Sequence, residues 1–241
     1  LSTSSFLASG IPGTVDGMFK IHKKYGSLPI KKLISPAIDL AEKGFILSKF
    51  QAEYFNSNRD KFSKNPETKK VFVKKDMWKR GDLFKQNDLA KTLERISKFG
   101  RDEFYSGETA KKIVNYFKKN GGIFTQNDFL NYQSTFKPPI CSTFIDYDIC
   151  SMSLPSSGGI VLSQSLNILE NFDLSSYDHD SLDYNRLLTE AMRFSFADRS
   201  EFLGDADFNN FDISKITSKK YAKTLASIIK SSKSKVDIDS P

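Results

Sequence analysis

The stretch SMSLPSSGGIVLSQSLNILENF, residues 151–172, joins the end of a predicted strand to a predicted helix through one proline, two serines and two glycines. The glycines indicate a tight turn, and the apolar run behind them is typical of a helix. Backbone N–H groups at a helix start lack partners and carry positive dipole, so such a corner can bind an anion or an oxyanion. Two hypotheses follow: a catalytic loop with a serine nucleophile, or a structural corner in which Ser156 or Ser157 caps the helix.

A serine nucleophile at this corner lacks support from the rest of the sequence. LPSSG misses the first glycine of the G-x-S-x-G elbow, and no GK[ST] follows it for a phosphate loop. Such a serine also needs a base. The chain has two histidines, His22 and His179, and the second lies in the polar, solvated-looking string SSYDHDS. The residues therefore favour a structural corner, with Gly158 and Gly159 at the turn, and they give no complete active site.

The string EAMRFSFADRSEFLGDADF, residues 190–208, is the second candidate for chemistry. Its charged residues include Glu190, Arg193, Asp198, Arg199, Asp205 and Asp207. On a helix the first four can pair at i,i+3 or i,i+4, and the last two follow the helix end. Paired carboxylates can perform acid–base work or hold Mg²⁺ or Ca²⁺. The spacing of a calcium loop is incomplete, however, and ion pairs that fix the helix end are the simpler interpretation. No His/Cys/Asp cluster has zinc spacing.

Ahead of the corner, PPICSTFIDYDICSMSLP predicts a hairpin of strands 139–145 and 147–153. With Ile145-Asp146 as its loop, Cys141 faces Cys150. Directly opposed Cβ atoms lie about 4.5–5.5 Å apart, whereas a disulfide prefers about 3.8 Å. The pattern therefore leaves both the paired and the free state open. Two cysteines exclude a cysteine zinc cage and a disulfide framework.

Several other segments carry helix signals. Ser35 and Pro36 predict a helix start in SPAIDLAEKGF, with Gly44 past its end. NDLAKTLERISKFG and GETAKKIVNYFKKNGG are amphipathic, and TQND has capping-box spacing. Further helices are expected over about 160–171, 181–203 and 218–230. We interpret 56–82 as an exposed lysine-rich excursion and 231–241 as a mobile tail.

The length suits one large domain or two small ones, and we expect a single domain over residues 1–241. Hydrophobic residues make up 39% and aromatic residues 13% of the 241 residues, which is enough to bury a sizeable core. No apolar run approaches the roughly 20 residues of a membrane span, and no signal peptide is visible. Because Leu1 is not a methionine, we expect a processed product or a fragment, so the compartment stays open.

The net charge of +7 is unevenly distributed. Residues 59–80 hold nine Lys/Arg and three acids, and residues 215–235 hold seven Lys and no acid. Residues 170–212 hold eleven acids and three Arg. Basic runs are typical of nucleic-acid-binding proteins. No nucleic-acid motif accompanies these runs, and they contain far more Lys than Arg. We therefore interpret them as solvated faces and do not expect a nucleic-acid partner.

Several strings together resemble the large subunit of γ-glutamyltranspeptidases. They are GIPGTVDGM, KYGSLPIKKLISPAIDLAEKGFILS, KRGDLFKQNDLAKTLERISKFGRDEFYSGETAKKIV, NGGIFTQNDFLNY, PSSGGI…LNILENFDL and EAMRFSFADRSEFLGDADF. Each is modest alone, but their order and spacing over about residues 8–225 are specific. The resemblance implies an α+β chain, helix-rich with a few strands, that forms the large-subunit part of an αββα N-terminal-nucleophile hydrolase sandwich.

The resemblance also implies a reaction, cleavage of the γ-glutamyl amide of glutathione. The family makes a proenzyme that cuts itself into two subunits and exposes a threonine at the start of the small one. That hydroxyl attacks, its own α-amine acts as base, and backbone N–H groups of the small subunit hold the oxyanion. Water, an amino acid or a dipeptide then accepts the glutamyl group. No metal or organic cofactor is required, and relatives are exported to the periplasm or the outside face.

Two family features have no counterpart in this sequence. The Thr-Thr-His-type motif that starts the small subunit is absent, and so is the arginine that clamps the substrate's α-carboxylate upstream of GIPG. We therefore assign no catalytic, substrate-binding or metal residue to this chain and expect the nucleophile on a separate small subunit. The alternative is a non-catalytic remnant or scaffold subunit of a split gene. A nucleic-acid-binding protein is a third and weaker hypothesis.

Overall fold

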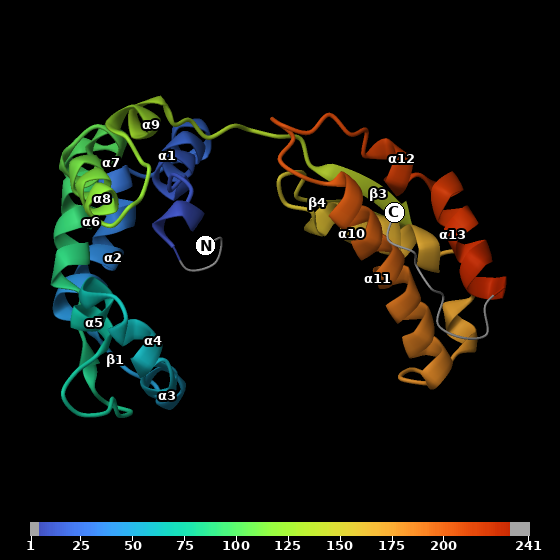
Figure 1. Ribbon diagram of the computed structural model, residues 1–241, viewed down its shortest axis with the longest axis horizontal. Coiled ribbons are helices and arrows are strands. Elements are labelled where there is room, and N and C mark those ends of the chain that lie inside the picture. Colours follow the sequence, from blue (N-terminus) through green and yellow to red (C-terminus); the bar gives the residue numbers. More distant parts are fainter. Residues whose placement is uncertain (1–4, 232–241) are drawn as a thin grey trace. The chain divides into compact units, whose positions relative to one another are not determined.

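The computed structural model describes residues 5–231 (Figure 1). Within this range the chain forms thirteen α-helices, two 3-10 turns and four short strands, which confirms a helix-rich α+β chain with few strands. No helix of residues 5–231 is long and apolar enough to cross a bilayer. The contacts divide the chain into two compact units, Leu1–Thr135 and Phe136–Pro241. The division falls within 132–139, which has no regular structure and ends in Pro138-Pro139, a pair that disfavours a continuing helix.

The regular structure of unit 1 is almost entirely helical. After a 3-10 turn, Phe6–Ala8, its elements are α1 Thr14–Tyr25, α2 Ile30–Lys43, β1 Phe45–Ile46, α3 Lys49–Ser57, α4 Arg59–Ser63, α5 Pro66–Phe72, β2 Leu83–Phe84, α6 Asn87–Phe99, α7 Arg101–Tyr105, α8 Glu108–Lys119 and α9 Gln126–Asn131. The antiparallel pair β1–β2 places Phe45 opposite Phe84. Helix α2 packs along α6, and α7 connects to α8 and α1. One core cluster contains Tyr105, Ala110 and Phe129.

Helix α2 starts earlier than the sequence signals indicate. The predicted cap Ser35 and Pro36 lie inside the helix, which begins at Ile30 after Pro29. The apolar stripe explains the difference, because Ile30, Leu33 and Ile34 continue it by more than a turn ahead of Pro36. A proline within a helix removes one backbone hydrogen bond, and here the packing of that stripe outweighs the loss. The predicted end at Gly44 is confirmed, with φ of 85°.

The segment 56–82 is more structured than the predicted excursion. Its lysines at 61, 64, 69, 70, 75 and 79 are exposed. Its rings, however, form a cluster with the flanking elements, made of Phe55, Phe62, Phe72, Trp78 and Phe84. Asn56 holds the backbone of Trp78 through two 2.8 Å hydrogen bonds, and the indole N–H donates to the Phe72 carbonyl at 2.7 Å. Because the segment is rich in lysine, its sequence did not indicate this local aromatic core.

Unit 2 places three long helices beside one hairpin. Its elements are β3 Ile140–Phe144, β4 Tyr147–Ser151, α10 Gly158–Leu169, a 3-10 turn Leu174–Ser176, α11 Leu182–Phe202, α12 Ser214–Thr217 and α13 Lys219–Ser231. The core lies where α10, α11 and α13 meet and includes Ile168, Leu187, Ala191, Ala226 and Ile229. Ser181 caps α11 as predicted, with its hydroxyl accepting from Tyr184 N–H. Apart from Ser231, the predicted mobile tail 231–241 lies outside the described residues.

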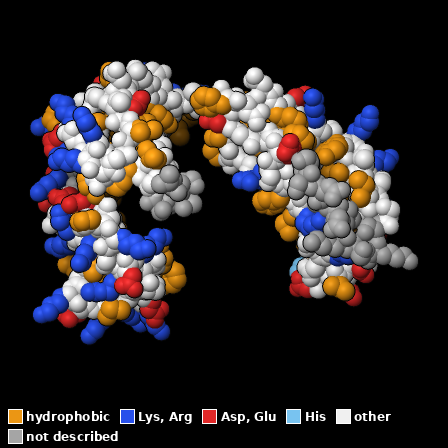
Figure 2. Space-filling model, viewed as in Figure 1, with side chains coloured by type: hydrophobic (Ala, Val, Ile, Leu, Met, Phe, Trp, Pro, Cys, Tyr) orange, Lys and Arg blue, Asp and Glu red, His pale blue; other side chains and the backbone are white. Residues whose placement is uncertain are grey.

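The two units differ in charge. Residues 1–135 carry 25 Lys/Arg and 14 Asp/Glu, whereas residues 136–241 carry 11 and 15. Lysine and arginine side chains spread over the face of unit 1 that is visible in Figure 2. The basic character of the protein therefore belongs to unit 1.

The hairpin β3–β4 has the predicted register. Cys141 lies opposite Cys150 across the loop Ile145-Asp146, and the two cysteines form a disulfide. Both cysteines are exposed. The choice between paired and free thiols, open in the sequence, is thereby decided in favour of the disulfide.

Removing this disulfide should weaken unit 2 measurably. A crosslink that closes a loop of about ten residues is worth about 2 to 3 kcal/mol, mainly by restricting the unfolded chain. We expect the full chain with Cys141→Ser and Cys150→Ser to unfold at lower temperature than the wild type under non-reducing conditions. Dithiothreitol should lower the wild-type transition to the same point and leave the double variant unchanged. Identical melting of the two proteins without reductant would contradict this prediction.

Candidate functional site

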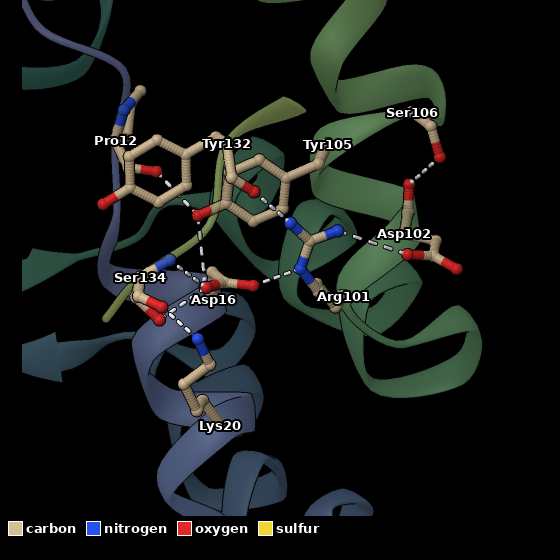
Figure 3. Close-up of polar contacts among 9 residues, drawn as sticks. All are labelled: Pro12, Asp16, Lys20, Arg101, Asp102, Tyr105, Ser106, Tyr132 and Ser134. Atoms are coloured by element: carbon tan, nitrogen blue, oxygen red, sulfur yellow. Dashed lines mark hydrogen bonds and ion pairs between the residues drawn. The ribbon is translucent and has the colours of Figure 1, made fainter. Parts of the chain in front are cut away.

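The most connected polar site of unit 1 surrounds Asp16, in the first turn of α1 (Figure 3). This carboxylate is buried, with 5% of the residue exposed. One oxygen accepts from Nε of Arg101 on α7, and the other accepts from the backbone N–H and the hydroxyl of Ser134. Three segments that are far apart in the sequence, around 16, 101 and 134, are thus held by one carboxylate.

Two stacked tyrosines complete this site. The ring of Tyr105 lies 5.6 Å from that of Tyr132, and the Arg101 guanidinium sits 4.5 Å from the Tyr105 centroid. The Tyr105 hydroxyl donates to the Pro12 carbonyl at 2.7 Å and accepts from Asp16 N–H at 3.1 Å. A methyl group on Gly13 would overlap the Tyr132 hydroxyl. In GIPGTVDG, Gly13 therefore leaves room for Tyr132, and Asp16 holds the surrounding segments together.

The electrostatics of Asp16 follow from its partners. Burial by itself raises the pKa of the carboxyl, but the hydrogen bonds from Ser134 and Arg101 outweigh it and lower the pKa to about 2. The same ion pair raises the pKa of Arg101, against the effect of its own burial. Perturbed carboxylates can mark reactive sites. Here both oxygens are already bonded within the chain, so the arrangement suits a structural clamp better than an acid or a base.

A second buried carboxylate, Glu103, ties α6, α7 and α8 together. It accepts from Arg95 Nε at 2.7 Å, from the Thr109 hydroxyl at 2.7 Å and from the Glu108 N–H at 3.0 Å. Burial raises the pKa of Glu103, and these hydrogen bonds bring it below its usual value. Gly107 leaves room for this carboxylate, since a methyl group there would overlap Oε2. Both oxygens of Glu103, like those of Asp16, therefore already accept hydrogen bonds from neighbouring residues.

In unit 2 the Pro155–Gly159 corner is a structural contact. Ser157 occupies the N-cap position of α10 but makes no capping hydrogen bond, contrary to the expected cap. Its hydroxyl instead accepts from Nε of Arg199 on α11 at 2.8 Å. Gly159 is buried against the hairpin, and Gly158 is exposed. The corner thus fixes α10 to the hairpin through Gly159 and to α11 through Ser157.

Helix α10 has a buried polar face, although its sequence is mostly apolar. Gln164 donates to Asp198 of α11, which also accepts from the Tyr221 hydroxyl at 3.3 Å. Burial, followed by the neighbouring Asp198, raises the pKa of Tyr221 to about 12. Further along, the Ser165 and Ser195 hydroxyls bond at 2.9 Å, and Asn167 donates to the Thr217 carbonyl at 2.7 Å. These bonds join α10 to α11 and α12, and they join α13 to α11.

The predicted charged candidates are only partly brought together. Arg193 pairs with both oxygens of Glu190 at 2.9 Å, as the i,i+3 spacing predicts, whereas Asp198 and Arg199 bond to α10 and its start. Asp205 accepts from the N–H of Asp207, whose carboxylate lies 3.5 Å from Lys137 Nζ. No cluster of three metal-ligating side chains occurs among residues 5–231.

Each histidine contacts a residue close to it in the sequence. His22 Nε2 is 2.7 Å from the Leu28 carbonyl oxygen, and His179, about four-fifths exposed, lies beside Asp180. Sequence reasoning missed the clamps at Asp16 and Glu103. Each is a single acid within an ordinary helix, and its partners come from other segments, so no local signal marks it.

Comparison with known proteins places the chain in a family. The model of the family described as gamma-glutamyltranspeptidase matches residues 1–240. The glutathione hydrolase proenzyme of Escherichia coli (strain K12) is 41% identical over 236 residues, which are 97% of this chain and 41% of that protein. The glutathione hydrolase proenzyme of Bacillus subtilis (strain 168) is 39% identical over 223 residues, 92% of this chain and 38% of that protein.

Solved structures agree with the sequence comparison. The crystal structure of Helicobacter pylori gamma-glutamyltranspeptidase superposes with a TM-score of 0.91 and 44% identity, covering 95% of this chain and 66% of that chain. The Pseudomonas nitroreducens enzyme complexed with L-DON gives a TM-score of 0.88 and 36% identity, covering 95% and 68%. The chain spans about two fifths of the length of the curated relatives. It has the predicted fold, that of the large-subunit part of an N-terminal-nucleophile hydrolase, and it belongs to the gamma-glutamyltranspeptidase family.

Proposed function

We propose that this chain is the large-subunit portion of a glutathione hydrolase that cleaves γ-glutamyl amides. The observation that carries the proposal is a family match along residues 1–240, with relatives that are named glutathione hydrolase proenzymes and are about two and a half times as long as the matched part. The proposed reaction uses a nucleophile, a base and oxyanion donors that we place on the small subunit.

The proposed reaction uses a threonine at the N-terminus of a separate small subunit. Its hydroxyl attacks the γ-glutamyl carbonyl, its α-amine takes the proton, and backbone N–H groups of the small subunit hold the oxyanion. The protonated α-amine gives that proton to the leaving nitrogen as the C–N bond breaks, so the amine product leaves and a γ-glutamyl-threonine ester remains. Water, an amino acid or a dipeptide attacks the ester, which releases the glutamyl group and restores the hydroxyl.

The proposed role of this chain is to support the small subunit. The two buried carboxylates, Asp16 and Glu103, already accept hydrogen bonds from their own neighbours, which favours a supporting role over a second catalytic centre. The exposed disulfide of the hairpin suits an oxidising compartment, which agrees with the proposed periplasmic or extracellular location.

The first test is turnover of a γ-glutamyl anilide by the purified chain. We expect none from this chain alone, and release of the aniline when the small subunit is coexpressed with it. A small-subunit variant with Thr→Ala at its first residue is the matched control and should abolish the signal without preventing assembly.

Two outcomes would contradict the proposal. Turnover by this chain alone would place a nucleophile within it. A correctly assembled pair that leaves both γ-glutamyl anilide and glutathione intact would instead favour the non-catalytic scaffold. Sequencing the flanks of the reading frame supplies the partner, because an adjacent frame that begins near a Thr-Thr-His-type motif supports a working heterodimer.

A further inference from the structure

We infer that a groove of unit 1, formed by α1, α2 and α6, is the docking site for an apolar, carboxylate-bearing segment of the polypeptide that completes the proposed enzyme. The inference rests on the proposed function for the source of that segment. The groove itself is a property of the described residues and involves none of the clamps above.

The shape and lining of the groove come from how the helices pack. Helix α2 packs along α6, while α1 packs against α7, so a space of about 540 Å³ remains between α1 and the α2–α6 pair. Its lining is almost wholly apolar and includes Met18, Ile21, Tyr25, Leu33, Ile34 and Leu93. Binding pockets in proteins commonly have this size and a mainly apolar lining.

The exposure of the lining is unusually high for such side chains. Met18 is 62%, Ile21 52% and Tyr25 68% exposed, and all three lie on the same helix. Contiguous exposed apolar surface is typical of sites that bind a protein, a ligand or a membrane.

Charge narrows the chemistry of the occupant. Between Asp16 and Asp39 the sequence contains five lysines and no acid. Lys23 lies between lining residues of α1, and Lys31 and Lys32 lie next to lining residues of α2; all three are exposed. An occupant with apolar side chains in the groove and Asp or Glu at its edges matches this pattern, because complementary charge favours the encounter and fixes orientation.

The length of the relatives supports the proposed source of the docking segment. This chain covers 41% of the Escherichia coli protein and 66% of the Helicobacter pylori chain. A large part of each relative therefore has no counterpart among residues 1–241, and that part must find surfaces to pack on. The groove is an apolar surface of unit 1 with the size and charge to receive some of it.

The test compares two methionine-to-lysine variants of the full chain. Met18→Lys places a charge in the groove, whereas Met77→Lys changes a methionine of similar exposure outside the lining. Each tagged chain is coexpressed with the polypeptide that completes the enzyme, and the captured partner is quantified. We expect Met18→Lys to reduce capture at least tenfold and Met77→Lys to change it less than twofold. Lys31→Glu with Lys32→Glu should weaken capture and remove its salt dependence.

Each alternative outcome contradicts the inference. Equal capture by both variants, or no capture by the wild type, would mean that the segment does not dock here. Self-association of the wild type that Met18→Lys abolishes would assign the groove to a second copy. Binding to vesicles of phosphatidylcholine and phosphatidylglycerol that Met18→Lys abolishes would assign it to a lipid surface. Turnover of γ-glutamyl anilide is measured separately, so capture without turnover removes the proposed function and leaves the groove assignment standing.

Discussion

Replacing Asp16 by asparagine is expected to lower the free energy of unfolding of unit 1 by about 3 kcal/mol at pH 7. The substitution keeps the shape of the side chain but removes the negative charge that holds Arg101 Nε and two groups of Ser134. The guanidinium is about 28% exposed and would remain beside a neutral amide. Urea unfolding of the full chain, followed by fluorescence of Trp78 within unit 1, measures the loss.

The pH dependence of this loss isolates the carboxylate. The pKa of Asp16 is about 2 in the folded chain, whereas an unfolded aspartate titrates near 3.9. The unfolded chain therefore binds the proton first as the pH falls, so the stabilisation is complete above about pH 5 and is lost progressively towards pH 2. A shift of nearly two units corresponds to about 2 to 3 kcal/mol. The gap between wild type and variant should narrow below pH 4.

A neighbouring acid provides the control for Asp16. Asp102 also lies near Arg101, with 3.5 Å between Oδ1 and Nη1, but its side chain is 82% exposed. Such exposed pairs contribute about 0 to 1 kcal/mol, so Asp102→Asn should be nearly neutral at all pH values. Equal effects of the two substitutions, or a gap that stays constant down to pH 3, would show that the clamp is not the source of the stability.

Replacing Gly159 by alanine is the second substitution with a large expected effect. A methyl group there would overlap the Met152 carbonyl oxygen and stand 2.9 Å from Ile140 Cγ2 and 3.0 Å from Ser151 Cβ. Because one of these atoms is backbone, either the hairpin or the start of α10 must move. We expect a loss of about 3 kcal/mol from the free energy of unfolding of unit 2, at the upper end of typical overpacking costs.

The adjacent glycine supplies a matched control. At Gly158 a new methyl group meets only the Ser156 hydroxyl, 3.8 Å away, and alanine is the better helix former by up to about 1 kcal/mol. Gly158→Ala should therefore be neutral or slightly stabilising. Thermal unfolding of the two full-length variants, read by circular dichroism, gives the comparison. Two alanine variants with the same midpoint would mean that α10 does not start in close contact with the hairpin.

Patterns that involve neighbours in the sequence could be predicted well. The hairpin loop at Ile145-Asp146, the Thr125–Asp128 capping box and the Ser181 cap depend on residues within a few positions of one another. The helix stop at Gly100 is similarly local. For such features the side chains and the backbone groups they serve are both visible in one short string. The order of several strings then carried the family assignment.

Structure was predicted less well where two sequence signals conflict within one segment. Ser35-Pro36 is a strong start signal, but the apolar stripe ahead of it extends α2 back to Ile30. The lysines of 56–82 indicated exposure, and they concealed the rings of Phe62, Phe72 and Trp78. In both cases burial against other elements decided the outcome, and a local rule does not include that burial.

By itself the sequence determined the helix-rich α+β class, most element positions, the hairpin register and the family. Only the tertiary structure decided which polar groups are buried and paired. Asp16 meets Ser134 across 118 positions, and Ser157 meets Arg199 across 42. The corner at Gly158-Gly159 is likewise a contact between a helix and a hairpin. Periodicity and capping depend on residues that are neighbours along the chain. The contribution of a buried charge to stability depends instead on partners that are brought close only by folding.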